Sequence, residues 1–128
     1  MVTDPIADFL VRLQNAFNVE QTHVSVPSSK VIQALAEVLK REGYISNAVY
    51  HKNDNTLVVE LAYKNGRPSI AGTKRISKPS RRMYQGVRDI KPVKHGHGLL
   101  VLSTPAGILT GKEALQKRVG GEALFEIW

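Results

Sequence analysis

Apolar side chains near the start of the chain recur at helical spacing in two separate stretches, and this pattern restricts the fold more than any other feature of the sequence. Asp4 and Pro5 form a typical helix start, with Asp4 as N-cap and Pro5 at the first helical position. A second helix begins at Ser28 or Ser29 and ends at Gly43. The apolar face of the first helix consists of Ile6, Phe9, Leu10, Leu13 and Phe17, and that of the second consists of Ile32, Leu35, Ala36 and Leu39.

Strand-like segments lie between and after the two predicted helices. Residues 22–26 alternate polar and apolar side chains before the second helix. Two further strands are predicted at 44–50 and 56–63, joined by the turn-forming residues 52–55. The first half is therefore expected to run helix, strand, helix, strand, strand.

The composition changes after Gly66, where Asn65-Gly66 and Pro68 mark a domain boundary. We expect an N-terminal α/β domain at residues 1–66 and a basic, mostly β domain at residues 67–128. The strands of the second domain are predicted at 70–77, 87–90, 99–102 and 122–128, with a turn at 103–107.

One short helix is expected in the second domain. Thr110 and Glu113 match a capping box, in which each side chain satisfies the backbone N–H of the other. The helix should run to about Val119 and stop at Gly120-Gly121. With an N-terminal helix-strand-helix-strand-strand unit and a mostly antiparallel C-terminal unit, the predicted fold class is α+β.

Charge is distributed unevenly along the chain, whose formal net charge is +7. Residues 1–66 hold 6 basic and 7 acidic side chains, a net of −1, whereas residues 67–128 hold 12 and 4, a net of +8. The segment from Lys74 to Lys94 holds one acidic residue, Asp89, and eight basic residues. The basic residues are Lys74, Arg75, Lys78, Arg81, Arg82, Arg88, Lys91 and Lys94. This asymmetry predicts that the second half faces a polyanion, with a solvated basic surface as the alternative.

Composition excludes several classes of protein. The hydrophobic fraction of 42% is enough for a packed core, so wholesale disorder is excluded. We expect no membrane protein, since no apolar run approaches the roughly 18 residues that span a bilayer, and no secretory signal. The chain has no cysteine, which removes disulfides, thiol chemistry and thiolate zinc sites and is compatible with a reducing cytoplasm.

No complete catalytic, cofactor or metal site is visible. The glycines and serines match no P-loop, dinucleotide fingerprint or nucleophile elbow. His95 and His97 have metal-ligand spacing, but Asp89 is the closest acid, so a polar loop is the favoured interpretation. We therefore expect no enzyme, no cofactor and no metal. The alternative is a phosphate-handling enzyme built on the helix start beside Thr110, with His95 or His97 as acid or base.

The turn at 103–107 is expected to join a strand to a helix N-terminus, where free N–H groups favour anions. The hydroxyls of Ser103, Thr104 and Thr110 can bond phosphates or base edges, although an ordinary capped connection explains them equally well. Gly120-Gly121 allows positive φ, close backbone approach or helix termination. Tyr84 stands among arginines and could stack on a base or lie half-buried under the sheet.

Six motifs, in this order, resemble those of the bacterial small-subunit ribosomal protein eight family. In the first half they are Asp4-Pro-Ile-Ala-Asp8 with Arg12-Leu-Gln-Asn15, then Pro27-Ser-Ser-Lys30, then Leu39-Lys-Arg-Glu-Gly-Tyr-Ile45. In the second half they are Arg75-Ile-Ser-Lys-Pro79, then Arg82-Met-Tyr84, then Gly98 to Thr110 with Gly120-Gly121-Glu122. The resemblance covers essentially the whole chain.

This resemblance implies a structural protein of the small ribosomal subunit with no catalytic activity. It would bind directly to a helix in the central domain of small-subunit ribosomal RNA and assist the folding of that domain and subunit assembly. The implied partners are this RNA, neighbouring small-subunit proteins including protein five, and the chain's own messenger RNA, with no membrane. The implied location is the cytoplasmic ribosome, with an organelle ribosome as the alternative.

The resemblance also implies a set of RNA-binding residues. Loop contacts map onto Ser103 and Thr104, with Gly107, Thr110, Gly120, Gly121 and Glu122 nearby, and backbone contacts onto Ser28, Ser29, Lys30, Arg82 and Tyr84. Three positions depart from the family pattern. Pro105 replaces a serine and loses its hydroxyl and N–H, Gly111 replaces an aspartate at the helix start, and Ser80 stands where glycine is common. The loss of the aspartate is expected to make that helix start more receptive to phosphate.

Overall fold

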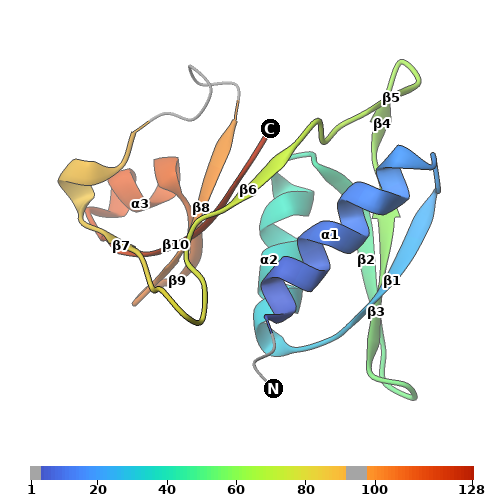
Figure 1. The fold of residues 1–128 in the computed structure, drawn as a ribbon, viewed down its shortest axis with the longest axis horizontal. Helices are drawn as coiled ribbons and strands as arrows, with labels where there is room; N and C mark the ends of the chain where they lie inside the picture. The colour runs from blue at the N-terminus through green and yellow to red at the C-terminus, as the bar shows by residue number, and fades with distance from the viewer. Residues whose placement is uncertain (1–3, 92–97) are drawn as a thin grey trace. The chain divides into compact units, whose positions relative to one another are not determined.

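The computed structural model describes residues 4–91 and 98–128. These residues form two compact units, one of Pro5–Ala71 and one of Asp4 with Gly72–Trp128 (Figure 1). The turn at Asn65 and Gly66, both with positive φ, belongs to the first unit, where it closes a small hairpin. Among the described helices, none is long and apolar enough to cross a membrane.

The first unit places two helices on one face of a three-stranded antiparallel sheet (Figure 1). Its strands follow the order β1-β3-β2, so the central strand is the last of the three in the sequence. The predicted succession of helix, strand, helix, strand, strand is confirmed. The elements are α1 (Pro5–Asn18), β1 (His23–Pro27), α2 (Lys30–Arg41), β2 (Ile45–His51), β3 (Thr56–Leu61) and the hairpin strands β4 (Tyr63–Lys64) and β5 (Arg67–Pro68).

The core of this unit is formed by the inward-facing side chains of β3 and the apolar faces of α1 and α2. Leu57, Val59 and Leu61 alternate inward, because successive side chains of a strand point to opposite faces. The predicted apolar faces are buried in both helices, apart from Ile6 at the start of α1. Full burial of each large side chain contributes roughly 1.5–3 kcal/mol before the entropy of ordering is subtracted.

Both ends of α2 are closed as the sequence predicts. The Ser29 hydroxyl accepts a hydrogen bond from the backbone N–H of Ile32 at 3.2 Å. At the other end Gly43 has a φ of 83°, and the N–H of Tyr44 reaches back to the carbonyl of Leu39 at 2.9 Å. These bonds satisfy the free carbonyls of the last turn, so the helix stops there.

Over residues 72–91 and 98–128, the second unit is a five-stranded antiparallel sheet with one short α-helix. Its strand order is β6-β10-β8-β9, and β7 also pairs with β10. The predicted α+β class is thus confirmed. The elements are β6 (Thr73–Arg75), β7 (Tyr84–Gln85), the 3-10 helix η1 (Val87–Asp89), β8 (Leu99–Thr104), β9 (Gly107–Thr110), α3 (Gly111–Lys117) and β10 (Gly121–Ile127).

Several predictions for this unit were wrong in detail, among them the strand at 70–77, which is formed only at Thr73–Arg75. The segment 87–90 contains a 3-10 helix instead of a strand, with the Asp89 carboxylate accepting from the N–H of Gly86 at 3.1 Å. The helix α3 ends at Lys117, because Arg118 adopts a left-handed φ of 55° and closes it before Gly120-Gly121. The strand β9 was not predicted, so the turn at 103–107 joins two strands and does not lead directly into a helix.

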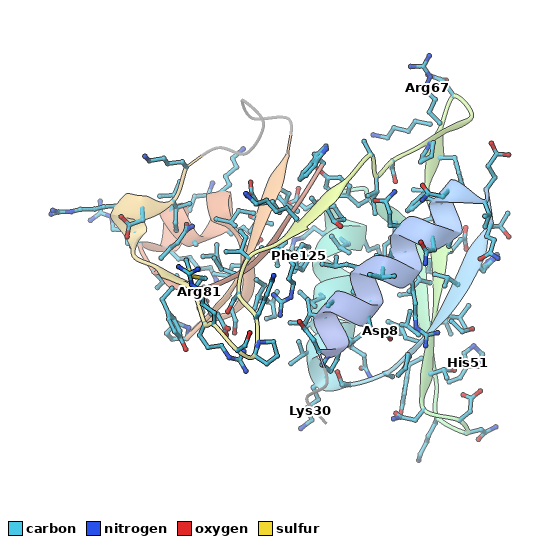
Figure 2. All side chains as sticks on the ribbon, in the orientation of Figure 1. Asp8, Lys30, His51, Arg67, Arg81 and Phe125 are labelled. Carbon is cyan, nitrogen blue, oxygen red and sulfur yellow. The ribbon has the colours of Figure 1, made fainter. Side chains whose placement is uncertain are left out.

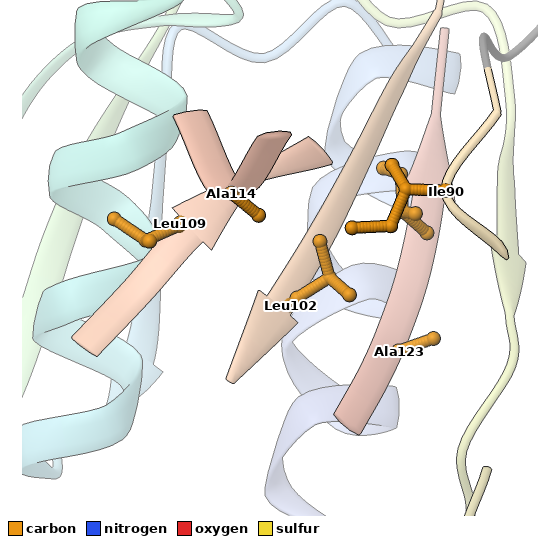
Figure 3. Packing of buried hydrophobic residues seen from close by; sticks show 6 residues of the cluster. Ile90, Leu102, Leu109, Ala114 and Ala123 are labelled. Atoms are coloured by element: carbon orange, nitrogen blue, oxygen red, sulfur yellow. The ribbon is translucent and has the colours of Figure 1, made fainter. Parts of the chain in front are cut away.

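The core of the second unit lies between α3 and one face of its sheet (Figure 3). Ile90, which follows η1, packs into this cluster although the segment around it is exposed. Ile76 and Val119 lie at its margin. The buried members of the cluster are Ile90, Leu100, Leu102, Leu109, Ala114 and Ala123.

Candidate nucleic-acid interface

The tip of the β8–β9 hairpin is a tight turn that Thr104 holds together. Thr104 Oγ1 donates to the carbonyl of Gly107 at 2.8 Å and accepts from the N–H of Ala106 at 3.1 Å. Gly107 has a φ of 109°, in the region that favours glycine. The loop is therefore closed by its own side chain and presents a narrow, exposed tip.

Pro105 fits this turn without distortion of the pairing. It is the first of the two residues between the paired Thr104 and Gly107, where a fixed φ near −65° is favourable and no ladder N–H is required. Ala106 provides the N–H that Thr104 binds. The proline thus stands at a position where the local backbone needs no donor.

A row of directly opposed residues crosses the sheet from β7 to β8. Glu122 of β10 is the register partner of Tyr84 on one side and of Ser103 on the other. Opposed residues of antiparallel strands point to the same face, with Cβ atoms about 4.5–5.5 Å apart. Tyr84 is 71% exposed, so its ring is not half-buried under the sheet, and stacking on a base stays a prediction.

Gly120 and Gly121 serve close backbone approach, one of the interpretations left open by the sequence. A Cβ at Gly120 would lie 2.4 Å from the carbonyl oxygen of Gln85, and one at Gly121 would lie 2.2 Å from that of Ser103. Any side chain at either position would push β7 or β8 away from β10. The two glycines therefore bring Tyr84 and Ser103 to the same strand.

The Glu122 carboxylate is engaged by two neighbours. It accepts a hydrogen bond from the Ser77 hydroxyl and an ion-paired one from Arg82 Nη1 at 3.0 Å. Burial acts to raise the pKa of Glu122, but these two bonds and the nearby positive charge outweigh it, so the pKa lies below its ordinary value. The same bond raises the pKa of Arg82.

Most of the cations in the basic segment are exposed, and one is not. Arg75 is 12% exposed and pairs with Asp4 through Nε at 3.3 Å and Nη2 at 3.2 Å. Its Nη1 also donates to the carbonyl of Leu124. The exposed cations are Lys74, Lys78, Arg81, Arg82, Arg88 and Lys91, of which Arg81 is labelled in Figure 2; Lys94 lies outside the described residues.

The start of α3 does not offer the anion site that the sequence suggested. Thr110 is 1% exposed, and its hydroxyl accepts from the N–H of Glu113 at 3.1 Å in the predicted capping box. Gly111 is also buried, and a Cβ there would lie 3.2 Å from Ile90. Packing therefore covers this helix start, which corrects the expectation that Gly111 opens it to phosphate.

The predicted contacts of the first half lie in the other unit, at the start of α2. Ser28 is buried and accepts from Gln33 Nε2 at 2.8 Å, while Ser29 is the N-cap. The N–H of Ser28 donates to the carbonyl of Asn55 at 3.0 Å, which ties this turn to the β2–β3 turn. Of the three predicted residues, Lys30 extends an exposed charge (Figure 2).

The described part of the chain contains no cluster of three or more histidine, aspartate or glutamate side chains able to hold a metal. The predicted spacing of His95 and His97 lies outside the described residues.

The model of the ribosomal protein S8 family matches residues 4–128. The chain belongs to the ribosomal protein S8 family. The small ribosomal subunit protein uS8 of Oleidesulfovibrio alaskensis is 50% identical over 128 residues, covering 100% of both chains. Those of Roseiflexus castenholzii and Streptococcus gordonii are 47% and 42% identical, each over at least 98% of both chains.

Membership of the S8 family confirms the resemblance stated from the motifs. It also confirms that the chain is a structural, non-enzymatic protein, since the family is a structural component of the ribosome. The alternative of a phosphate-handling enzyme is therefore dropped.

Two residues of this S8-family site were missed or misassigned by sequence reasoning. Ser77 was treated as one residue of a strand, and its buried hydroxyl gives no local signal because its partner Glu122 is 45 residues away. Arg75 was counted with the surface cations, because its carboxylate partner, Asp4, is 71 residues away in the sequence. Pairing along β10 brings Ser77 to Glu122, since the N–H of Ser77 donates to the carbonyl of Ala123 at 3.0 Å.

Proposed function

We propose that this chain is a structural constituent of the small ribosomal subunit that binds an irregular helix in the central domain of small-subunit ribosomal RNA. In this role it assists the folding of that domain and subunit assembly. Membership of the S8 family and the names of its relatives support the ribosomal role. The proposed binding domain is the basic segment 67–128.

The observation that carries this proposal is the register of β10, which sets Ser103 and Tyr84 on either side of one residue. Duplex RNA hides its base edges in a deep major groove, so proteins read irregular loops and the shallow minor groove. The hairpin tip at Thr104 is small enough to enter such a groove. The exposed ring of Tyr84 offers a stacking surface for an unpaired base or sugar beside it.

Electrostatics supports the same assignment. Lys78, Arg81 and Arg82 lie within five residues on an exposed loop directly before β7. These cations would hold phosphates near the hairpin and supply most of the salt-dependent affinity. Among the predicted contact residues, we assign direct contact to Ser103, Thr104, Gly107, Arg82 and Tyr84, with the glycines at 120 and 121 shaping the surface.

A second contact is proposed at the start of α2, through Ser29 and Lys30. Ser29 caps the helix and, like Lys30, is exposed, and a helix N-terminus beside an ammonium group suits a phosphate. Ser28 would act by holding this turn. We also propose that the chain lies in the cytoplasmic ribosome, next to other small-subunit proteins that include protein five, and that its own messenger RNA is a further ligand.

The test is binding of the purified chain to a hairpin that carries the irregular central-domain helix. A fully paired version of the hairpin and a DNA duplex serve as controls, each at several salt concentrations. We expect tight binding to the irregular RNA alone, with a salt slope that counts the phosphates engaged. Equal and steeply salt-dependent binding to all three would contradict the proposal and leave a general nucleic-acid-binding module.

A further inference from the structure

The loop between Ser77 and Met83 carries exposed cations but has few backbone anchors. Lys78 and Arg81 exchange both backbone hydrogen bonds at 3.0 Å, which closes a two-residue turn at Pro79 and Ser80. Beyond this turn, the loop is tied to the rest of the unit near its ends. Its cations therefore keep a defined position only if those ends are held firmly.

Ser77 holds both ends of the loop together. Its side chain is completely buried, and its hydroxyl oxygen accepts from the backbone N–H of Met83 at 3.2 Å. The same hydroxyl donates to the Glu122 carboxylate, and the Met83 carbonyl accepts from the N–H of Ala123 at 2.9 Å. One serine thus joins the start of the loop, its end and β10.

Glu122 in turn holds the guanidinium group of Arg82. One carboxylate oxygen, Oε2, binds both Ser77 and Arg82, and the side chain of Glu122 is 16% exposed while that of Arg82 is 53% exposed. The arginine therefore has one side against the carboxylate and the rest open to a ligand. Tyr84 follows two residues later, and its backbone is held beside Glu122 by the pairing of β7 with β10.

A carboxylate at this place is unfavourable for binding a polyanion by charge alone. A negative charge within a few ångströms of a phosphate opposes binding, and the opposition is strongest where water is displaced. Its depressed pKa keeps Glu122 ionised near neutral pH. The carboxylate must therefore contribute something that outweighs this repulsion if the site binds RNA.

We propose that Glu122 and Ser77 are positioning residues for RNA binding: together they hold Arg82 and Tyr84 in the orientation that the RNA requires, and the Glu122 carboxylate does not itself contact the RNA. This inference rests on the proposed function. It assigns a role to Ser77 and gives Glu122 a role different from that of a direct contact.

The test is a double-mutant cycle on the dissociation constant for the irregular hairpin. Glu122→Gln retains an acceptor for Ser77 but removes the charge that holds Arg82. We expect it to weaken binding roughly tenfold, the usual effect of losing a charge-assisted hydrogen bond. In an Arg82→Gln background, itself weaker in binding, Glu122→Gln should change the dissociation constant by less than about twofold, because the arginine that the lost charge holds is already absent and the acceptor for Ser77 is kept.

Two other results would overturn the inference. Equal weakening by Glu122→Gln in both backgrounds would mean that the carboxylate contacts the RNA directly. Unchanged or stronger binding would mean that it only repels phosphate. Glu126→Gln is the matched control, since it removes the same charge from the same strand and the register partner of Glu126 on β6 is Lys74.

Ser77→Ala tests the other half of the pair. It removes the hydroxyl that joins Met83 to Glu122, and we expect weaker RNA binding at a temperature where circular dichroism shows the variant fully folded. Full affinity in the folded variant would remove Ser77 from this role. Failure of the proposed function is seen separately, as equal binding of the unaltered chain to irregular and fully paired hairpins.

Discussion

Gly121 in β10 approaches the backbone of Ser103 in β8 so closely that a Cβ at position 121 would lie 2.2 Å from the Ser103 carbonyl oxygen. The same Cβ would lie 3.0 Å from Cγ2 of Thr104. The strand that carries Glu122 and the hairpin that carries the hydroxyl residues are therefore fitted to each other with no room for a side chain. This contact links packing of the sheet to the position of the proposed RNA-binding loop.

Gly121→Ala should destabilise the second unit and displace the hairpin. Relief of the clash requires movement of backbone, and overpacking of this kind costs about 1–3 kcal/mol or more. Urea unfolding measures the loss, and RNA binding of the remaining folded protein should fall as well. Gly86→Ala is the matched control, because a Cβ there would meet only Asp89 Oδ2 at 3.5 Å. A Gly121→Ala protein as stable as the control would contradict the close fit.

Thr104→Ala should weaken binding of the irregular hairpin by about 1–3 kcal/mol and affect unrelated RNA much less. The substitution removes the hydroxyl that joins Ala106 to Gly107 and with it the closed shape of the tip. Thr104→Ser keeps the hydroxyl and should retain most of the affinity. Equal losses on both RNAs would remove Thr104 from specific recognition.

Arg75→Gln and Arg81→Gln each remove one positive charge, but they should differ in their effect on the free energy of unfolding. Arg75 is paired with the partly buried Asp4, so its loss should lower the free energy of unfolding by about 2–4 kcal/mol. Arg81 is exposed at the loop turn, so its loss should leave stability within about 0.5 kcal/mol.

RNA binding distinguishes the same two arginines. Arg81→Gln should weaken binding to all sequences and reduce the salt slope by about one, as loss of a phosphate contact does. Arg75→Gln, measured where it is fully folded, should leave the slope unchanged. A reduced slope for Arg75→Gln would show that its guanidinium reaches phosphate after all.

The stability contributed by Glu122 should depend on pH in a defined direction. Its pKa in the folded chain lies below the ordinary 4.5, so its ionised form favours folding. The contribution is therefore complete well above pH 4.5 and is lost as the pH falls through the lowered, folded-state value. Unfolding of the unaltered chain and of Glu122→Gln should differ near neutral pH and converge in acid. A difference that grows on acidification would contradict the sign of this shift.

The elements that sequence reasoning predicted well are those whose signals lie within a few residues. The stripes of α1 and α2, the cap at Ser29, the terminator Gly43 and the capping box at Thr110 all act over one or two helical turns. The site was predicted through the motifs of the resemblance. Their order along the chain identifies a family but not the contacts that each residue makes.

Errors came where a distant contact outweighed a local preference. Gly120-Gly121 looked like a helix stop, but the sheet requires glycine there for close approach, and the helix ends earlier at Arg118. Thr110 and Gly111 looked like an open anion site, yet packing of α3 on its sheet covers both. In each case the structural role of the residue depends on a contact with a residue far along the chain.

The sequence by itself determined the α+β class, the order of elements in the first half, the basic character of the second half and the family. These follow from periodicity, caps and composition, which depend on residues close together. Only the tertiary structure decided that Arg75 is a structural cation, that Ser77 and Glu122 meet across 45 positions, and that Tyr84 and Ser103 flank one strand. The physical reason is that these contacts join residues far apart in the sequence, and those within the sheet are set by strand register, which is determined by the packing of the whole sheet.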